Sequence, residues 1–139
     1  MGTLNYAGVV VEFDDRVLTH LQIVVLQKFR RGDAFPMSWV DDVSVGAGRG
    51  TIWLTPAVPI YFRFEGSRVP CIDQAWIDVL AESANGPRGL IVTDASGVPI
   101  KATGAGHRPH AAGAGAARRP ADLDGLTRTA RSRRPGTAR

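Results

Sequence analysis

The residues best suited to chemistry lie between positions 38 and 59, where two tryptophan-bearing segments flank a loop of acids, glycines and one arginine. In this loop the pattern Gly46-x-Gly48-x-Gly50 surrounds Arg49, so backbone N–H groups and a guanidinium could cradle a phosphate. A dinucleotide-binding glycine motif, however, lies between a strand and a helix, whereas a strand follows this loop. The pattern therefore favours a glycine-rich connecting loop over a phosphate site.

Two further groups could support catalysis or metal binding. Asp41 and Asp42 could hold a hard cation, but adjacent acids at a strand end point in different directions and form no complete ligand set. A solvated turn in which they pair with Arg49 or Arg31 is favoured. His20 could act as a general base, but no motif places a nucleophile, which favours a hydrogen-bonded structural histidine. We therefore predict no metal ion, no cofactor and no catalytic residue.

Aromatic residues and arginines on the expected strands could bind a partner. Trp39, Trp53 and Tyr61 could stack bases, with Arg49 and Arg63 near phosphates. On a small sheet, however, such aromatic residues are more often core or dimer surface, and the acidic body of the chain disfavours nucleic acid. The candidate functional surface comprises Ser38, Trp39, Asp41, Asp42, Arg49, Trp53, Tyr61 and Arg63.

Two helices and several strands must position these residues. Residues 16–31 carry apolar side chains at helical spacing, and Asp14 and Asp15 precede them as helix-starting acids. Ile23 and Leu26 lie off the apolar face, which leaves the back of this helix apolar enough to meet a partner. A second amphipathic helix is predicted over residues 72–83.

The strands follow from period-two patterns. Apolar residues alternate over residues 4–13 with a break at Ala7-Gly8, which predicts a first strand with a bulge or turn. Further strands are predicted at residues 35–40, 51–54, 60–65 and 90–92. The order β-α-β-β-β-α-β predicts a two-layer α+β sandwich, with two helices on one face of a mostly antiparallel sheet. Tyr61 and Arg63 would lie on the open face, together with Trp39 or Trp53, whose register the pattern does not fix.

Charge divides the chain into two parts. The 139 residues are 44% hydrophobic, which is enough for one cored domain. Through residue 100 there are 8 Lys and Arg against 11 Asp and Glu, and from residue 101 there are 9 against 2. We therefore predict a domain over residues 1–98 and a disordered basic tail over residues 99–139. The tail could bind polyanions weakly through Arg118, Arg119, Arg128, Arg131, Arg133 and Arg134.

The cysteine content and the first residues suggest a cellular location. Cys71 is the only cysteine, so an intramolecular disulfide is excluded. The first residues lack the cationic and apolar regions of a signal peptide, and no run approaches the ~18 apolar residues of a membrane span. We expect a soluble cytoplasmic protein that does not contact a membrane.

Several ordered segments resemble a known group of proteins. They are EFDDRVLTHLQ (12–22), KFRRG (28–32), SWVDD (38–42), GRGTIWL (48–54), PAVPIYFRFEGSRVP (56–70) and the W…AN…GL series (76–90). Over residues 1 to 95 the chain resembles small uncharacterised proteins of high-GC Gram-positive bacteria, many labelled automatically as ATP-dependent DNA ligase. Pro36, Gly50 and Cys71 depart from the residues usual in that group.

The ligase activity that this resemblance implies requires a nucleophilic lysine in a K-x-D-G context. Lys28 is the only lysine before residue 101, and Phe29-Arg30-Arg31 follows it. Lys101 begins a K-x-x-G segment that lacks the aspartate. Ligase chemistry in this chain is therefore not expected.

Three functions stay open at this point. The leading hypothesis is a non-enzymatic α+β module that acts by association with itself, as a homodimer, or with a protein partner. The alternative is a nucleic-acid-associated accessory factor linked to DNA ligation or repair. The third is an enzyme of unrecognised type that uses Arg49, Asp41, Asp42 and His20.

Overall fold

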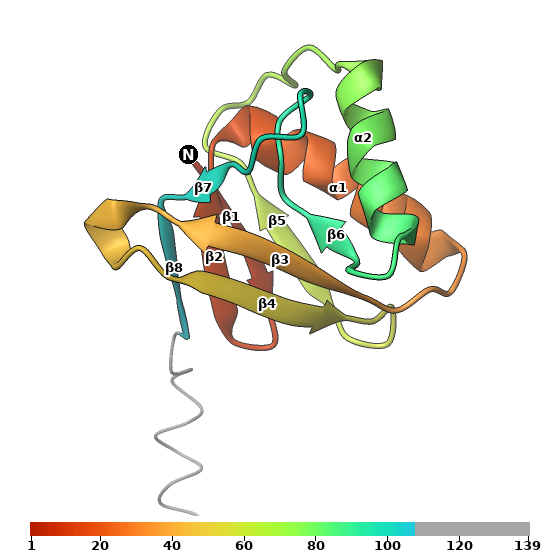
Figure 1. Cartoon of the computed structure of the whole chain (residues 1–139), viewed down its shortest axis with the longest axis horizontal. Coiled ribbons are helices and arrows are strands. Elements are labelled where there is room, and N and C mark those ends of the chain that lie inside the picture. Colours follow the sequence, from red (N-terminus) through yellow and green to blue (C-terminus); the bar gives the residue numbers. More distant parts are fainter. Residues whose placement is uncertain (108–139) are drawn as a thin grey trace, which may run out of the picture. The chain divides into compact units, whose positions relative to one another are not determined.

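The computed structural model describes residues 1–107, which form strands and two α-helices around a shared apolar core (Figure 1). The elements are β1 (Gly2–Tyr6), β2 (Val9–Phe13), α1 (Asp15–Arg30), β3 (Phe35–Asp41), the 3₁₀ turn η1 (Val43–Val45), β4 (Arg49–Leu54), β5 (Ile60–Arg63), α2 (Gln74–Asn85), β6 (Leu90–Ile91), β7 (Lys101–Ala102) and β8 (Gly104–His107). The predicted α+β class is confirmed.

The predicted first strand is a hairpin of two strands. Residues 7 and 8 both have positive φ, 51° at Ala7 and 86° at Gly8, as the type I′ turn of a two-residue hairpin requires. Tyr6 pairs with Val9 across the turn, and β1 and β2 run antiparallel from there. The interruption in the apolar alternation therefore marks a complete reversal of the chain.

The strands form two sheets instead of the single predicted sheet. Sheet A has the order β5-β1-β2-β8 and is antiparallel throughout. Sheet B has the order β4-β3-β6, and β7 also pairs with β3; β4 is antiparallel to β3, while β6 and β7 are parallel to it. The chain passes from sheet B to sheet A at Thr103, between β7 and β8. Alternation fixes only which side of a strand is buried, so it left the membership of each sheet undetermined.

The strand pairing continues past the predicted domain boundary at residue 98. The backbone N–H of Asp42 donates to the Ala102 carbonyl at 2.9 Å, and that of Thr103 donates to the Glu12 carbonyl at 3.0 Å. These strands are rich in Ala and Gly, and backbone pairing requires no large apolar side chain. The boundary was therefore placed too early. Residues 108–139, which include the six predicted polyanion-binding arginines, lie outside the described residues.

Both helices lie on the same side of the strands and pack against each other (Figure 1). Asp14 caps α1 by accepting from the Arg16 N–H at 2.9 Å, and Asp73 caps α2 by accepting from the Ala75 N–H at 3.0 Å. Ile23, predicted to face away from the core, is partly buried against it. Leu26 is 37% exposed, so little of the expected apolar back of α1 is free.

The core collects the inward side chains of both sheets and both helices. It includes Leu4, Val11, Phe13, Leu18, Leu21, Val25, Phe35, Met37, Leu54, Trp76, Leu80 and Leu90, each at most 5% exposed. The strand residues in this set alternate with exposed or half-exposed neighbours, as period-two strands with one buried side require. The outward sides of both sheets are therefore the surfaces on which a binding site can lie.

His20 joins the two helices inside this core and has no exposed surface. Its Nδ1 lies 2.7 Å from the Arg16 carbonyl, and its Nε2 accepts from the Asp73 N–H at 2.9 Å. Because a carbonyl only accepts and an amide N–H only donates, the ring is neutral with its proton on Nδ1. The ring also stacks on Trp76 at 4.2 Å. The prediction of a structural histidine is confirmed, and neither nitrogen is available as a general base.

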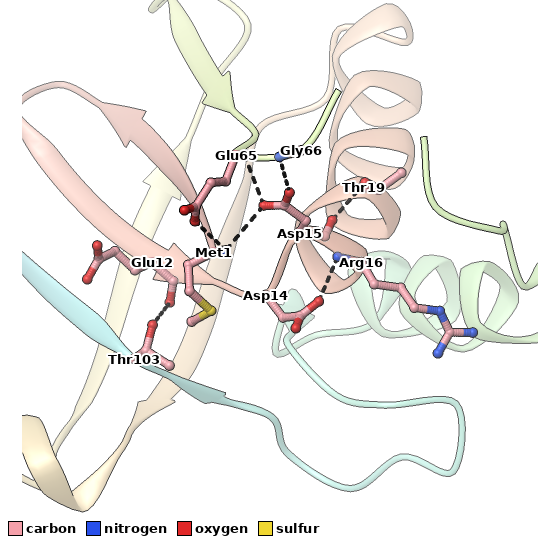
Figure 2. A network of polar contacts seen from close by, with 9 residues as sticks. All are labelled: Met1, Glu12, Asp14, Asp15, Arg16, Thr19, Glu65, Gly66 and Thr103. Carbon is pink, nitrogen blue, oxygen red and sulfur yellow. Dashed lines mark hydrogen bonds and ion pairs between the residues drawn. The ribbon is translucent and has the colours of Figure 1, made fainter. Parts of the chain in front are cut away.

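A polar network ties the first residue to α1 and to the segment after β5 (Figure 2). The Met1 ammonium lies 2.8 Å from Glu65 and 3.7 Å from Asp15. Asp15 also accepts from the Gly66 N–H at 2.8 Å and from the Glu65 N–H at 3.3 Å. The carboxylate of Asp15 thus fixes the β5–α2 connection against the start of α1.

This network makes stability depend on pH at both ends of the scale. The Gly66 N–H, against an opposing effect of desolvation, holds the pKa of the Asp15 carboxyl below its usual 3.8. The stabilisation is therefore present above pH 3.8 and is lost as the pH falls through the lowered pKa. The hydrogen bond to Glu65 raises the pKa of the Met1 amine above its usual 8.0, so that contribution is present below pH 8.0 and is lost as the pH rises through the raised pKa.

We expect Asp15→Asn to flatten mainly the acid side of the stability profile. The substitution removes the titrating carboxylate but leaves the Met1–Glu65 pair. Urea unfolding between about pH 3 and about pH 10 measures both sides of the profile. Glu82→Gln, at an exposed position of α2, is the control and should preserve the acid dependence. An acid limb that is equally steep in Asp15→Asn contradicts the assignment.

Candidate functional site

The glycine-rich segment between β3 and β4 is an exposed turn closed on itself. The N–H groups of Val45 and Ala47 both donate to the Asp42 carbonyl, at 2.9 and 3.2 Å. Gly46 has φ of 122°, a conformation that glycine adopts without strain. Because the turn uses these N–H groups internally, they do not converge on a ligand. The segment is a loop that connects two antiparallel strands, as predicted.

The two adjacent acids bind groups of the protein. Asp41 accepts from the Trp39 Nε1–H at 3.1 Å, and Asp42 accepts from the Ser44 N–H at 2.9 Å. The Ser44 N–H is the main cause that lowers the pKa of the Asp42 carboxyl, and Lys101 adds a smaller electrostatic contribution. Within residues 1–107, neither acid forms the expected ion pair with Arg49 or Arg31, and no three His, Cys, Asp or Glu side chains are grouped to hold a metal ion. The two acids are structural.

Trp39 belongs to the core and not to the candidate surface. Residues 35, 37 and 39 of β3 point inward, and Trp39 is buried. Its indole lies over Gly50 of β4, where an added Cβ would lie 2.7 Å from ring atom Cε2. Because Gly50 has no side chain, the Trp39 indole can pack over its backbone. The pairing register, which the sequence left open, decides the positions of both tryptophans.

The outer face of sheet B carries the side chains that alternate with this core. We define it as Pro36, Ser38 and Val40 of β3, Arg49, Thr51 and Trp53 of β4, Ile91 of β6 and Lys101 of β7. Ser38 lies opposite Thr51, and their hydroxyl oxygens are 2.8 Å apart. Trp53 is 60% exposed, whereas tryptophan side chains in folded proteins are on average largely buried. This face combines an exposed aromatic ring, hydroxyls and cations.

A pocket of about 520 Å³ opens on this face. It is lined by Ser38, Trp39, Val40, Arg49, Gly50, Thr51, Arg88, Ile91, Val92 and Pro99. The lining contains two arginines and two hydroxyl groups but no acidic residue. The pocket is therefore locally positive, although the domain as a whole is mildly acidic.

Sheet A holds the remaining predicted surface residues. Tyr61, which is 58% exposed, pairs with Asn5, and Arg63 pairs with Thr3 on the outer side of that sheet. The residues of the predicted surface thus lie in four places: the outer face of sheet B, the outer face of sheet A, the core, and the turn between β3 and β4. Ser38, Arg49 and Trp53 are together, whereas Trp39, Trp53 and Tyr61 do not form the common stacking surface considered from the sequence.

Sequence reasoning missed two polar residues of the pocket, Thr51 and Arg88. Thr51 alternates with Trp53 along β4, so period two could have placed it on the outer face. Arg88 lies in the connection between α2 and β6 and reaches the pocket only because β6 returns beside β3. No local sequence pattern indicates that β6 pairs with β3.

Comparisons with known proteins identify a family. No curated protein and no solved structure matches the chain. Within the described residues, neither helix has the length and apolar composition needed to cross a bilayer. Residues 1–95 match the family described as a domain of unknown function, DUF7882. Because this match spans more than half of the 139 residues and includes both helices and sheet strands up to β6, the chain belongs to the DUF7882 family.

Proposed function

We propose that this protein is a non-enzymatic association module that forms a homodimer by pairing β4 with β4 of a second copy. The observation that carries the proposal is the outer edge of β4, which within residues 1–107 pairs with no strand other than β3 and lies beside an exposed tryptophan. An unpaired strand edge presents backbone donors and acceptors to another chain, and strand addition is a common mode of association.

The backbone alternation identifies the free groups on this edge. The Asp41 N–H donates to the Gly48 carbonyl at 2.8 Å, so residue 48 faces β3. In an antiparallel pair, residues that bond the neighbour alternate with residues that face away. The N–H and C=O groups of Arg49, Thr51 and Trp53 therefore point to the open edge.

The side chains on this edge are self-complementary. An antiparallel pairing centred on Thr51 places Arg49 opposite Trp53 of the partner subunit, and the symmetry repeats the contact. A guanidinium over an indole is a favourable cation–π pair, and cross-strand pairs on one face are the unit of sheet stabilisation. The predicted homodimer thus acquires a specific register.

The separation of Trp39, Trp53 and Tyr61 favours association over base stacking.

Thr51→Pro should weaken the dimer, whereas Thr51→Val should retain it. Both substitutions remove the hydroxyl that contacts Ser38, but only proline removes the central N–H of the open edge. Sedimentation of the full chain over a concentration series measures the association, and circular dichroism checks that each variant is folded. We expect the proline variant to dissociate at least about tenfold more readily, the equivalent of one or two lost hydrogen bonds.

Two results would contradict the proposed homodimer. A wild-type chain that stays monomeric at the highest concentration reached contradicts the proposal. So does a folded Thr51→Pro variant that dimerises as well as Thr51→Val. Trp53→Ala supplies an independent check, because it removes the cation–π partner without altering the backbone of β4.

A further inference from the structure

The pocket on the outer face of sheet B has the composition of an anion site. Its volume of about 520 Å³ is in the range of small-ligand pockets. Arg49 and Arg88 both line it, and within residues 1–107 no ion pair involves either of them. Two guanidiniums in one pocket whose lining contains no acid favour a negatively charged ligand.

The hydroxyl pair on the same wall supplies a further donor. Ser38 Oγ and Thr51 Oγ1 lie 2.8 Å apart, so one hydroxyl donates to the other. The hydroxyl that accepts retains its own proton for another acceptor. Three donor groups, from Arg49, Arg88 and this pair, thus line the same pocket.

The rest of the pocket is apolar. Val40, Ile91 and Pro99, each at least partly exposed, contribute apolar side chains to the lining. An inorganic anion would leave these side chains uncovered, whereas a ligand with an apolar body would cover them and gain from their burial. The composition therefore indicates an organic anion.

We propose that this pocket binds a small organic phosphate monoester, with its phosphate between Arg49 and Arg88 and its apolar body against Ile91 and Pro99. A phosphate monoester offers three terminal oxygens to the two guanidiniums and the hydroxyl pair, whereas a carboxylate offers two and is satisfied by one arginine. Lys101, opposite Val40 on β7, adds positive charge to the same face, reduced by the nearby Asp42.

This site shares Arg49 and Thr51 with the proposed dimer contact but uses other groups of them. The dimer uses the Thr51 backbone, whereas the pocket uses the Thr51 hydroxyl. Stacking on an indole uses the flat face of the guanidinium, while its N–H donors lie in the plane and stay available to an anion. Arg88 lies outside β4 and takes part only in the pocket. Substitution of Arg88 therefore tests the ligand without testing the dimer.

Titration of the full chain with phenyl phosphate, followed by calorimetry, tests the proposal. Arg88→Gln should weaken the binding at least about tenfold, the effect of losing a charge-assisted hydrogen bond. Arg63→Gln, on the outer side of sheet A, is the matched control and should bind as the wild type does. Because further arginines follow residue 107, the difference between these two variants decides the result.

Three ligand controls define the chemistry. Benzoate should bind at least about tenfold more weakly than phenyl phosphate, because it satisfies fewer of the donors. Phenol should not bind measurably, and inorganic phosphate should bind more weakly than phenyl phosphate because it leaves the apolar lining uncovered. Equal affinities for benzoate and phenyl phosphate, or equal losses in the two arginine variants, would overturn the proposal. A monomeric wild type that binds phenyl phosphate would overturn only the dimer.

Discussion

Replacing His20 with alanine is expected to lower the free energy of unfolding by about 3 to 5 kcal/mol, the cost typical of truncating a large buried ring. The ring is fully buried and stacks on Trp76 at 4.2 Å. Its removal leaves a cavity between the two helices and deprives the Asp73 N–H of its acceptor. Urea denaturation followed by circular dichroism measures the loss.

The effect should be specific to the buried junction. Gln27→Ala, at an exposed position of the same helix, controls for changes in helix propensity and should alter stability by less than about 0.5 kcal/mol. A loss below about 1 kcal/mol in His20→Ala would mean that α1 and α2 remain joined without the histidine. That result contradicts the structural role assigned to His20.

Gly89→Ala is expected to cost about 2 to 5 kcal/mol, because two unfavourable effects add. Gly89 has φ of +75°, where a side chain is strained. An added Cβ would also collide with the Pro36 carbonyl of β3 and lie 2.7 Å from Cδ of its ring. Because Gly89 leads directly into β6, the collision would push β6 away from β3.

Gly97→Ala separates the two effects. Gly97 has a similar φ of +85°, but nothing lies within 4 Å of an added Cβ. Its substitution should therefore cost only the backbone strain, about 1 to 2 kcal/mol. Chemical denaturation of both variants gives the steric contribution as a difference. Equal losses would mean that the close approach of Gly89 to Pro36 does not constrain the fold.

The sequence was most informative where a local pattern has a local cause. The residue alternation over Ile60, Phe62 and Phe64 predicted β5 correctly, because strand period depends only on the chain itself. Both helices were predicted from apolar spacing, with their ends displaced by one or two residues. The capping aspartate of α2, Asp73, is a signal that the prediction passed over.

The candidate site was predicted only in part. Ser38, Arg49 and Trp53 were selected from residue type and share the outer face of sheet B. Trp39 was selected by the same criterion and is buried, because residues one position apart on a strand face opposite sides. The sequence pattern did not indicate whether Trp39 or Trp53 faces the core.

The sequence by itself determined the α+β class, the two helices, most of the strands and the structural role of His20, since each depends on residue spacing or on simple chemistry. Only the tertiary structure decided that the strands form two sheets and that β7 and β8 follow residue 98. It also placed Arg88 in the lining of the same pocket as Arg49, Ser38 and Thr51. The reason is that the pairing partner of a strand is set by contacts between distant segments, which compete for the same backbone groups and leave no periodic signal in either segment.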